Sequence, residues 1–210
     1  MKYKHIFWDW NGTLLNDAHV SFEAVNLMLD NRGLPRINFE QYREYVDVPI
    51  IKFYEKVMDV SKESMDALHV EFNSLCDKLF SDRPLFPEVC EVLNSLSQKG
   101  ISHYIFSSSA QKVILPKLKQ CGIYDCFEYV LGASDCYAGS KVERTKNYII
   151  DNDLPIESIL FVGDMVHDSE VASAIGADCI LIASGHQSEF VLLSTGRTVL
   201  PSLSALAELL

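Results

Sequence analysis

The sequence predicts an α/β fold, with a parallel sheet and an all-helical segment inserted after its first strand. From residue 84 onward, short apolar runs alternate with amphipathic helical patterns, which is typical of βαβ units. Residues 16–82 carry helical patterns only. Several predicted strands end in polar residues, so we expect a functional site at the carboxyl edge of the sheet.

The first predicted strand, Tyr3 to Trp8, leads directly into Asp9. The run is mostly apolar and aromatic, as in a strand buried on both faces. Gly12 permits backbone torsions that a residue with a Cβ resists, and consecutive N–H groups in such a turn can form a concave anion site. The stretch therefore predicts a carboxylate that faces an anion cradle. The alternative is a strand that ends in an ordinary Asx-turn.

The inserted segment, residues 16–82, is predicted to be a separate helical domain. Asn16 or Asp17 is placed to cap its first helix. The later helical patterns cover Phe39–Tyr45, Ile51–Met58 and Ser64–Phe80. Because the segment leaves the end of the first strand, it should lie above the site and act as a cap. The core domain is then formed by residues 1–15 and 83–210.

The remaining elements follow in alternation. Predicted strands cover residues 103–106, 128–131, 159–162 and 179–183, and a short strand and helix lie within 199–210. Predicted helices run from Val89 to Gly100, from Gln111 to Gln120, from the capping-box sequence Ser140-Lys141-Val142-Glu143 onward, and over residues 168–175.

Composition excludes several classes of function. The chain has 210 residues, of which 48% are hydrophobic and 22% charged, as in ordinary globular proteins. A net charge of −11 argues against a general nucleic-acid surface. The six cysteines form no CxxC pair, so we expect reduced thiols rather than a zinc site or disulfides. With neither a signal-peptide pattern nor a membrane-spanning apolar run, we expect a soluble cytoplasmic protein.

Two further carboxylates indicate a metal site. Asp164 follows an apolar strand, and Asp168 begins the next helix. If both meet Asp9, each pair of charges about 4 Å apart repels by roughly 4 kcal/mol at an effective dielectric constant of about 20. A divalent cation removes that cost, and hard oxygen ligands suit Mg²⁺. The alternative is helix capping plus an exposed carboxylate.

Lys141 and the serines at 107–109 complete the polar set. Lys141 starts a helix, where a cation is slightly disfavoured by the helix dipole, so a functional placement competes with a solvated lysine. Its ammonium group could neutralise phosphate oxygens while Ser107 donates a hydrogen bond. Ser107, Ser108 and Ser109 are hard to separate, although the serine nearest the strand end is the better ligand.

Together these motifs resemble the haloacid dehalogenase superfamily of hydrolases, in the branch similar to phosphoglycolate phosphatase and β-phosphoglucomutase. The four matching stretches, in order, are Asp9-Trp10-Asn11-Gly12-Thr13, Ser107 after an apolar strand, Lys141, and Gly163 to Asp168. The resemblance covers nearly the whole chain. It implies a Rossmann-like core with an inserted helical cap of the family's first type.

The resemblance also implies roles for individual residues. Asp9 would be the nucleophile that forms an aspartyl-phosphate. Mg²⁺ would be held by Asp9, the Asn11 main-chain carbonyl and Asp164, with Asp168 acting through water. The phosphate-binding residues would be Trp10, Asn11, Ser107, Ser108 and Lys141. The catalytic residues would be Asp9, Asn11, Ser107 and Lys141. Trp10 could instead pack beneath the cap.

Asn11 departs from the family pattern, which has a second aspartate there to protonate the leaving group and activate water. An amide can do neither. We therefore expect Asn11→Asp to accelerate hydrolysis of alkyl phosphates more than aryl phosphates. His186 is a candidate replacement proton carrier against the alternative of a loop histidine, and His167 is expected to face solvent.

Four functions remain open at this stage. The first is a Mg²⁺-dependent phosphohydrolase of a small organic phosphate. The second is a phosphate-ester binding or regulatory protein with impaired turnover, which rests on Asn11. Carbon–halogen cleavage without metal is disfavoured by the carboxylates at 164 and 168, and phosphomutase activity resembles relatives with the full acid at 11. Expected partners are a small phosphorylated metabolite, no nucleic acid and no membrane, with the chain a monomer or weak homodimer.

We predict that Asp9→Asn abolishes phosphoryl transfer and leaves the fold intact, because the amide removes the carboxylate nucleophile. Turnover of a purified phosphate ester and circular dichroism of the same preparation check this. Near-full turnover in the folded variant would remove Asp9 from the nucleophile's position.

Overall fold

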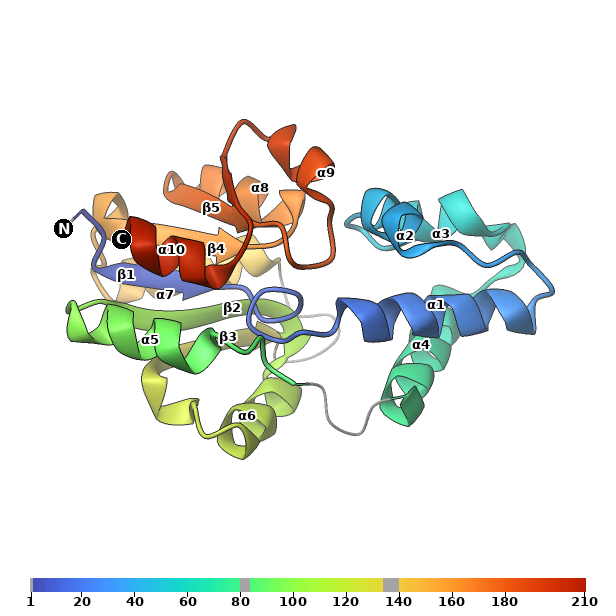
Figure 1. Ribbon diagram of the computed structural model, residues 1–210, viewed down its shortest axis with the longest axis horizontal. Helices are drawn as coiled ribbons and strands as arrows, with labels where there is room; N and C mark the ends of the chain where they lie inside the picture. The colour runs from blue at the N-terminus through green and yellow to red at the C-terminus, as the bar shows by residue number, and fades with distance from the viewer. Residues whose placement is uncertain (1, 80–83, 134–139) are drawn as a thin grey trace.

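A six-stranded, fully parallel sheet forms the centre of the computed structural model, which describes residues 2–79, 84–133 and 140–210 (Figure 1). The strand order is β3-β2-β1-β4-β5-β6. The strands are β1 His5–Trp8, β2 Ser102–Ala110, β3 Phe127–Ala133, β4 Ile159–Gly163, β5 Asp178–Ile182 and β6 Thr198–Leu200. In the register, His5 pairs with Ser102 on one side and with Ile159 on the other. This central place for β1 puts its carboxyl end between those of β2 and β4.

Helices cover both faces of the sheet, as a parallel sheet requires. They are α5 Val89–Gln98, α6 Gln111–Gln120, α7 Lys141–Asp151, α8 Val166–Ile175, α9 Glu189–Leu193 and α10 Leu203–Leu209. Successive side chains of β1 point to opposite faces. Ile6 and Trp8 join the core under α5, α6 and α10, whereas Phe7 joins the core under α7 and α8. Both cores are fully buried at β1, which holds that strand rigidly in place.

Four helices form a separate group beyond the carboxyl end of β1, at the right in Figure 1. We call them the helical block: α1 Ala18–Asn31, α2 Phe39–Tyr45, α3 Ile51–Val57 and α4 Met65–Leu79, with a 3₁₀ turn at Val60–Lys62. The block has its own apolar core, which includes Met28, Phe53 and Leu68. The Arg32 guanidinium ties two of its segments together through Glu63 (2.7 Å) and Glu71 (2.8 Å).

The two connections between the block and the sheet lie side by side. The Asn16 amide donates to the Pro84 carbonyl (2.9 Å), and the Phe86 amide donates to the Leu14 carbonyl (3.0 Å). The block therefore leaves the sheet and returns to it at one place. The domain boundaries expected at residues 15 and 83 stay a prediction, and residue 83 lies outside the described residues.

Most predicted elements are present, and the differences are local. Phe39–Tyr45 and Gln111–Gln120 are helices with the predicted bounds, and the capping box of Ser140 and Glu143 opens α7. The strand predicted at 103–106 is longer and includes all three serines, because β2 continues beside β3 past an irregularity in its register. Helix α9 was not predicted, since its five residues are too few for a periodic pattern.

Among the described residues, Cys90, Cys126 and Cys179 are free thiols, and Cys136 lies outside the described residues. Among those residues, no helix combines the length and apolar character needed to cross a membrane.

Candidate active site

Three carboxylates meet at the carboxyl edge of the sheet. Asp9 follows β1, Asp164 follows the neighbouring strand β4, and Asp168 lies in the first turn of α8. One oxygen from each lies within 4.8 Å of the others, and all three side chains are buried. Strand adjacency explains the meeting of Asp9 and Asp164, since parallel neighbours end at the same edge. The predicted convergence of the three carboxylates is therefore confirmed.

Lys141 supplies the positive charge at this cluster. Its Nζ donates to Asp9 Oδ1 (2.6 Å) and to Asp168 Oδ1 (2.7 Å), and it lies 4.0 Å from the centre of the Phe106 ring. The residue is buried at the first position of α7. A solvated lysine is thus excluded, and the unfavourable helix-dipole position is offset by two charge-assisted hydrogen bonds.

Asp168 has two roles at once. Its Oδ2 accepts hydrogen bonds from the main-chain amides of Asp164 (3.1 Å) and Met165 (3.0 Å), which satisfies the start of α8. Its Oδ1 faces Lys141. Helix capping and a role in the charged cluster were alternatives in the sequence, but the structure shows that one carboxylate performs both.

The electrostatics of the cluster favour an added cation. Burial raises the pKa of Asp9, Lys141 opposes that rise, and Asp168 and Asp164 add to it, with a net upward shift. Burial likewise raises the pKa of Asp164, to about 6. When all three carboxylates are ionised, the one ammonium group leaves two negative charges unbalanced in a buried space. A hard divalent cation such as Mg²⁺ matches both that charge and the oxygen donors.

Two glycines make room for Asp164. A Cβ on Gly12, which has φ +71°, or on Gly185 would lie 2.2 Å from Asp164 Oδ2. The carboxylate accepts hydrogen bonds from Thr13 Oγ1 (2.9 Å) and from the His186 amide (2.6 Å). The positive φ that Gly12 adopts was expected from the turn, whereas the close approach of Asp164 is a second reason for glycine there.

Asn11 makes two hydrogen bonds that fix its amide group. Its Nδ2 donates to Asp17 Oδ2 (2.5 Å), and its Oδ1 accepts from Ser109 Oγ (2.6 Å). An aspartate at position 11 would place two acceptor-only carboxylates in contact. We therefore no longer expect Asn11→Asp to accelerate hydrolysis. As a single substitution, it should instead disturb the turn. The ligand role of the Asn11 carbonyl stays a prediction.

The three serines of β2 have different surroundings. Ser107 is buried, and its Oγ accepts from the Ser109 amide (3.1 Å). Ser108 is exposed. Ser109 contacts the turn that follows β1, because its Oγ donates to Asn11 Oδ1. Ser109, which the sequence could not single out, is therefore the serine that contacts the turn directly, and the phosphate contacts of Ser107 and Ser108 stay predictions.

Trp10 and His167 lie away from the carboxylates. The Trp10 indole is buried in the core with Trp8 and Leu14, so only its main chain could contact a phosphate. It packs in the core of the sheet and not beneath the helical block. His167 faces Glu170 (3.3 Å) on the outer side of α8, which confirms the expected surface role.

His186 lies at the junction between the sheet and the helical block. Its Nε2 is 3.2 Å from Asp17 Oδ1, and its Nδ1 is 2.8 Å from the Tyr42 hydroxyl group of α2. Burial alone would lower the pKa of His186, but Tyr42 and Asp17 raise it well above the ordinary value. His186 is therefore a buried histidine that faces Asp17, and not a loop histidine in solvent.

Further hydrogen bonds close the same junction. Gln187 Nε2 donates to the Val46 carbonyl (2.8 Å), while its Oε1 accepts from the Val166 amide (2.6 Å). The Arg43 guanidinium donates to the carbonyls of Ala183 and Gln187. We call Tyr42, Arg43, Val46, His186 and Gln187 the junction. It joins the end of α2 to the loop after β5.

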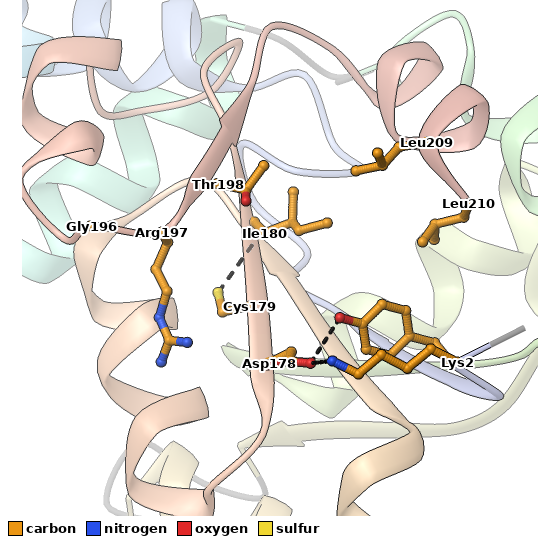
Figure 2. A pocket seen from close by; sticks show the side chains of 10 residues that line it. Lys2, Asp178, Cys179, Ile180, Gly196, Arg197, Thr198, Leu209 and Leu210 are labelled. Carbon is orange, nitrogen blue, oxygen red and sulfur yellow. Dashed lines mark hydrogen bonds and ion pairs between the residues drawn. The ribbon is translucent and has the colours of Figure 1, made fainter.

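A separate hollow of about 660 Å³ lies at the opposite edge of the sheet (Figure 2). Asp178, the first residue of β5, accepts hydrogen bonds there from Lys2 and from the Tyr3 hydroxyl group. Residues at the amino ends of β5 and β6 help to line this hollow, whereas Asp9 and Asp164 lie at the carboxyl ends of their strands, so the two places are separate.

Comparison with known proteins agrees with this geometry. Residues 6–182 match the family described as haloacid dehalogenase-like hydrolase. This chain belongs to that family. It is 27% identical to a phosphoglycolate phosphatase of Photorhabdus laumondii over 210 residues, covering 96% of this chain and 89% of the relative. A phosphoglycolate phosphatase of Vibrio parahaemolyticus is also 27% identical over 217 residues, with coverage of 98% and 95%.

A solved structure shows the same fold. A haloacid dehalogenase-like family hydrolase from Streptococcus pneumoniae superposes with a TM-score of 0.81 at 21% identity, covering 99% of both chains. The predicted α/β class and the predicted membership of this hydrolase family are thus confirmed.

Four side-chain hydrogen bonds near the carboxylates were not predicted from the sequence. They are made by Thr13, Asp17, Tyr42 and Ser109. Asp17 was assigned only to helix capping, yet its carboxylate makes no capping bond to α1. No local signal could have found it, because its partners are the turn before it and a histidine 169 residues later.

We predict that Asp164→Asn weakens Mg²⁺ binding by about tenfold or more, since even indirect partners of a metal contribute about 10–100-fold. The amide oxygen can still accept from Thr13 or the His186 amide, so the fold should persist. Isothermal titration with Mg²⁺ measures the change. Asp153→Asn, at an exposed residue, is the matched control. Equal affinity in both variants would remove Asp164 from the metal site.

The same variant should be more heat-stable than the wild type without metal. The folded-state pKa of Asp164, about 6, exceeds its ordinary value of 3.8, so folding favours the protonated form. The stability that this group contributes is present below pH 3.8 and is lost as pH rises through 6. Melting temperatures in EDTA across that range should show the advantage of Asp164→Asn growing with pH. A constant difference would contradict the shift.

Proposed function

We propose that this hydrolase is a Mg²⁺-dependent phosphatase that acts on a small organic phosphate monoester, similar to its phosphoglycolate phosphatase relatives. One observation carries the proposal: Lys141 bridges Asp9 and Asp168 inside a buried cluster of three carboxylates. Such a cluster is unfavourable for stability alone, because buried like charges repel and desolvation is costly. A bound metal ion and an anionic substrate would explain why such a cluster is present.

The proposed reaction has two displacements at phosphorus. An Asp9 carboxylate oxygen attacks phosphorus, the ester P–O bond breaks, and the leaving oxygen takes a proton from a water molecule. Water then attacks the aspartyl-phosphate, which releases inorganic phosphate and restores the carboxylate. Lys141 contacts Asp9 through Oδ1, so it orients the carboxylate while Oδ2 remains for the attack.

The charged groups have distinct tasks in this proposal. Asp9, Asp164 and Asp168 would hold the cation, which when bound would neutralise charge on the carboxylates and the phosphoryl oxygens. Lys141 would stabilise the phosphoryl oxygens, as a fixed ammonium group does for developing negative charge. Thr13 and the His186 amide keep the Asp164 carboxylate in one orientation.

The burial of the site supports a small substrate and a moving cap. Asp9 is only 8% exposed and Asp164 is fully buried. A phosphate ester would therefore reach Asp9 only after part of the surrounding structure moves, and we propose that the helical block is the part that moves. The block would then act as a cap that opens at the junction, admits the substrate, and excludes water on closing.

We predict turnover of small phosphate monoesters that requires Mg²⁺. A panel of esters with and without Mg²⁺, and with EDTA followed by excess Mg²⁺, provides the measurement. EDTA should abolish phosphate release and Mg²⁺ should restore it. Activity that persists in EDTA, or no release from any ester, would contradict the proposal.

We also predict that Gln187→Leu reduces discrimination against bulky esters. The leucine side chain cannot bond the Val46 carbonyl or the Val166 amide, so the closed junction is weakened. The ratio of kcat/KM for a small alkyl ester to that for a bulky aryl ester should fall. Glu44→Gln, at an exposed position of α2, is the control. An unchanged ratio in Gln187→Leu would refute a selecting role for the block.

A further inference from the structure

Asp17 occupies the capping position of α1 but does not cap that helix. An aspartate at this position usually accepts a hydrogen bond from the second or third amide of its helix. Here the side chain makes no such bond and turns back to the catalytic turn. Oδ1 accepts from the Gly12 amide (2.9 Å), and Oδ2 accepts from Asn11 Nδ2 (2.5 Å). Helix α1 therefore has no side-chain cap from Asp17, and the carboxylate instead accepts hydrogen bonds from the turn.

The pairing of Asn11 with Asp17 allows only one orientation of the Asn11 amide group. A carboxylate only accepts hydrogen bonds, so the amide nitrogen of Asn11 must face Asp17 and its Oδ1 must face Ser109. Two carboxylates in these places would repel, and two amides would lack the charge that faces His186. The two positions therefore accommodate one carboxylate and one amide.

We propose that Asn11 and Asp17 form one functional unit, in which Asp17 is a positioning residue that holds the Asn11 amide and the Gly12 amide in the geometry for phosphoryl transfer at Asp9. The proposal rests on the proposed phosphatase function. Asn11 lies two residues after Asp9 in the chain, so restraint of the Asn11 side chain and the Gly12 amide also restrains the main chain that carries the proposed nucleophile.

The surroundings of Asp17 keep it charged and immobile. The side chain is buried, and burial would raise its pKa, but His186, Asn11 and the Gly12 amide together lower it. His186 in turn contacts Tyr42 of the helical block. The unit is thus held from the block side as well as from the turn.

The reversed pair should make the same hydrogen bonds. In Asn11→Asp with Asp17→Asn, the amide oxygen at 17 can accept from the Gly12 amide and His186, and its nitrogen can donate to the carboxylate at 11. The other carboxylate oxygen at 11 can accept from Ser109 Oγ. Net charge is unchanged, so the double variant restores the hydrogen bonds of the pair, while its negative charge moves from position 17 to position 11.

The test compares Asn11→Asp, Asp17→Asn and the double variant with the wild type. Kinetics are measured on p-nitrophenyl phosphate at saturating Mg²⁺, with melting temperatures of the same samples. We expect each single variant to lose about tenfold or more in kcat and the double variant to recover to within about threefold of the wild type, as coupled residues do. KM should change less than kcat. Asn16→Asp, which adds a charge to the same loop, should match the wild type.

Two results would overturn the proposal. One is a double variant whose loss in kcat equals the product of the two single losses. The other is recovery of the melting temperature without recovery of kcat, which would make the pair structural only. Failure of the phosphatase proposal is distinguishable, because it would appear as absent turnover in the wild-type protein before any substitution.

Discussion

The charge balance around Lys141 is the constraint on which the rest of this structure depends. An unpaired buried charge costs several kcal/mol, about what the burial of two or three large apolar side chains returns. Asp9 and Asp168 are tolerated because one ammonium group pairs with both. That pairing requires α7 to begin at the carboxyl edge of the sheet. The apolar layers on both faces of β1 hold the strand rigidly enough to keep these distances.

A second buried contact between titratable side chains extends this arrangement toward the helical block. His186 and Asp17 pair beside the cluster, and Tyr42 completes the contact from α2. The main chain of His186 also holds Asp164. The position of the block and the orientation of the turn are therefore physically connected by hydrogen bonds. This connection explains why the loop after β5 is buried, although loops usually lie on the surface.

The fold was largely predictable because its signals are local, whereas the site was predictable only in part. Apolar runs, capping boxes and the order of strands follow from neighbouring residues, as for the capping box of Ser140. Asp9, Lys141, Asp164 and Asp168 could be predicted to meet because parallel strands end at one edge. Asp17 and Ser109 could not, since their roles depend on contacts between distant segments. For the same reason, the structure changes the prediction for an aspartate at 11, because the carboxylate of Asp17 beside that position is not visible in the sequence.

The central claim is that this cluster makes Asp9 a nucleophile toward phosphorus. Mass spectrometry of the peptide that contains Asp9, after brief reaction with a phosphate ester and an acid quench, tests it most directly. The account predicts a phosphoryl group on Asp9 that appears with Mg²⁺ and is absent in EDTA. Phosphate release without any adduct on Asp9 under single-turnover conditions, or an adduct on another residue, would contradict it.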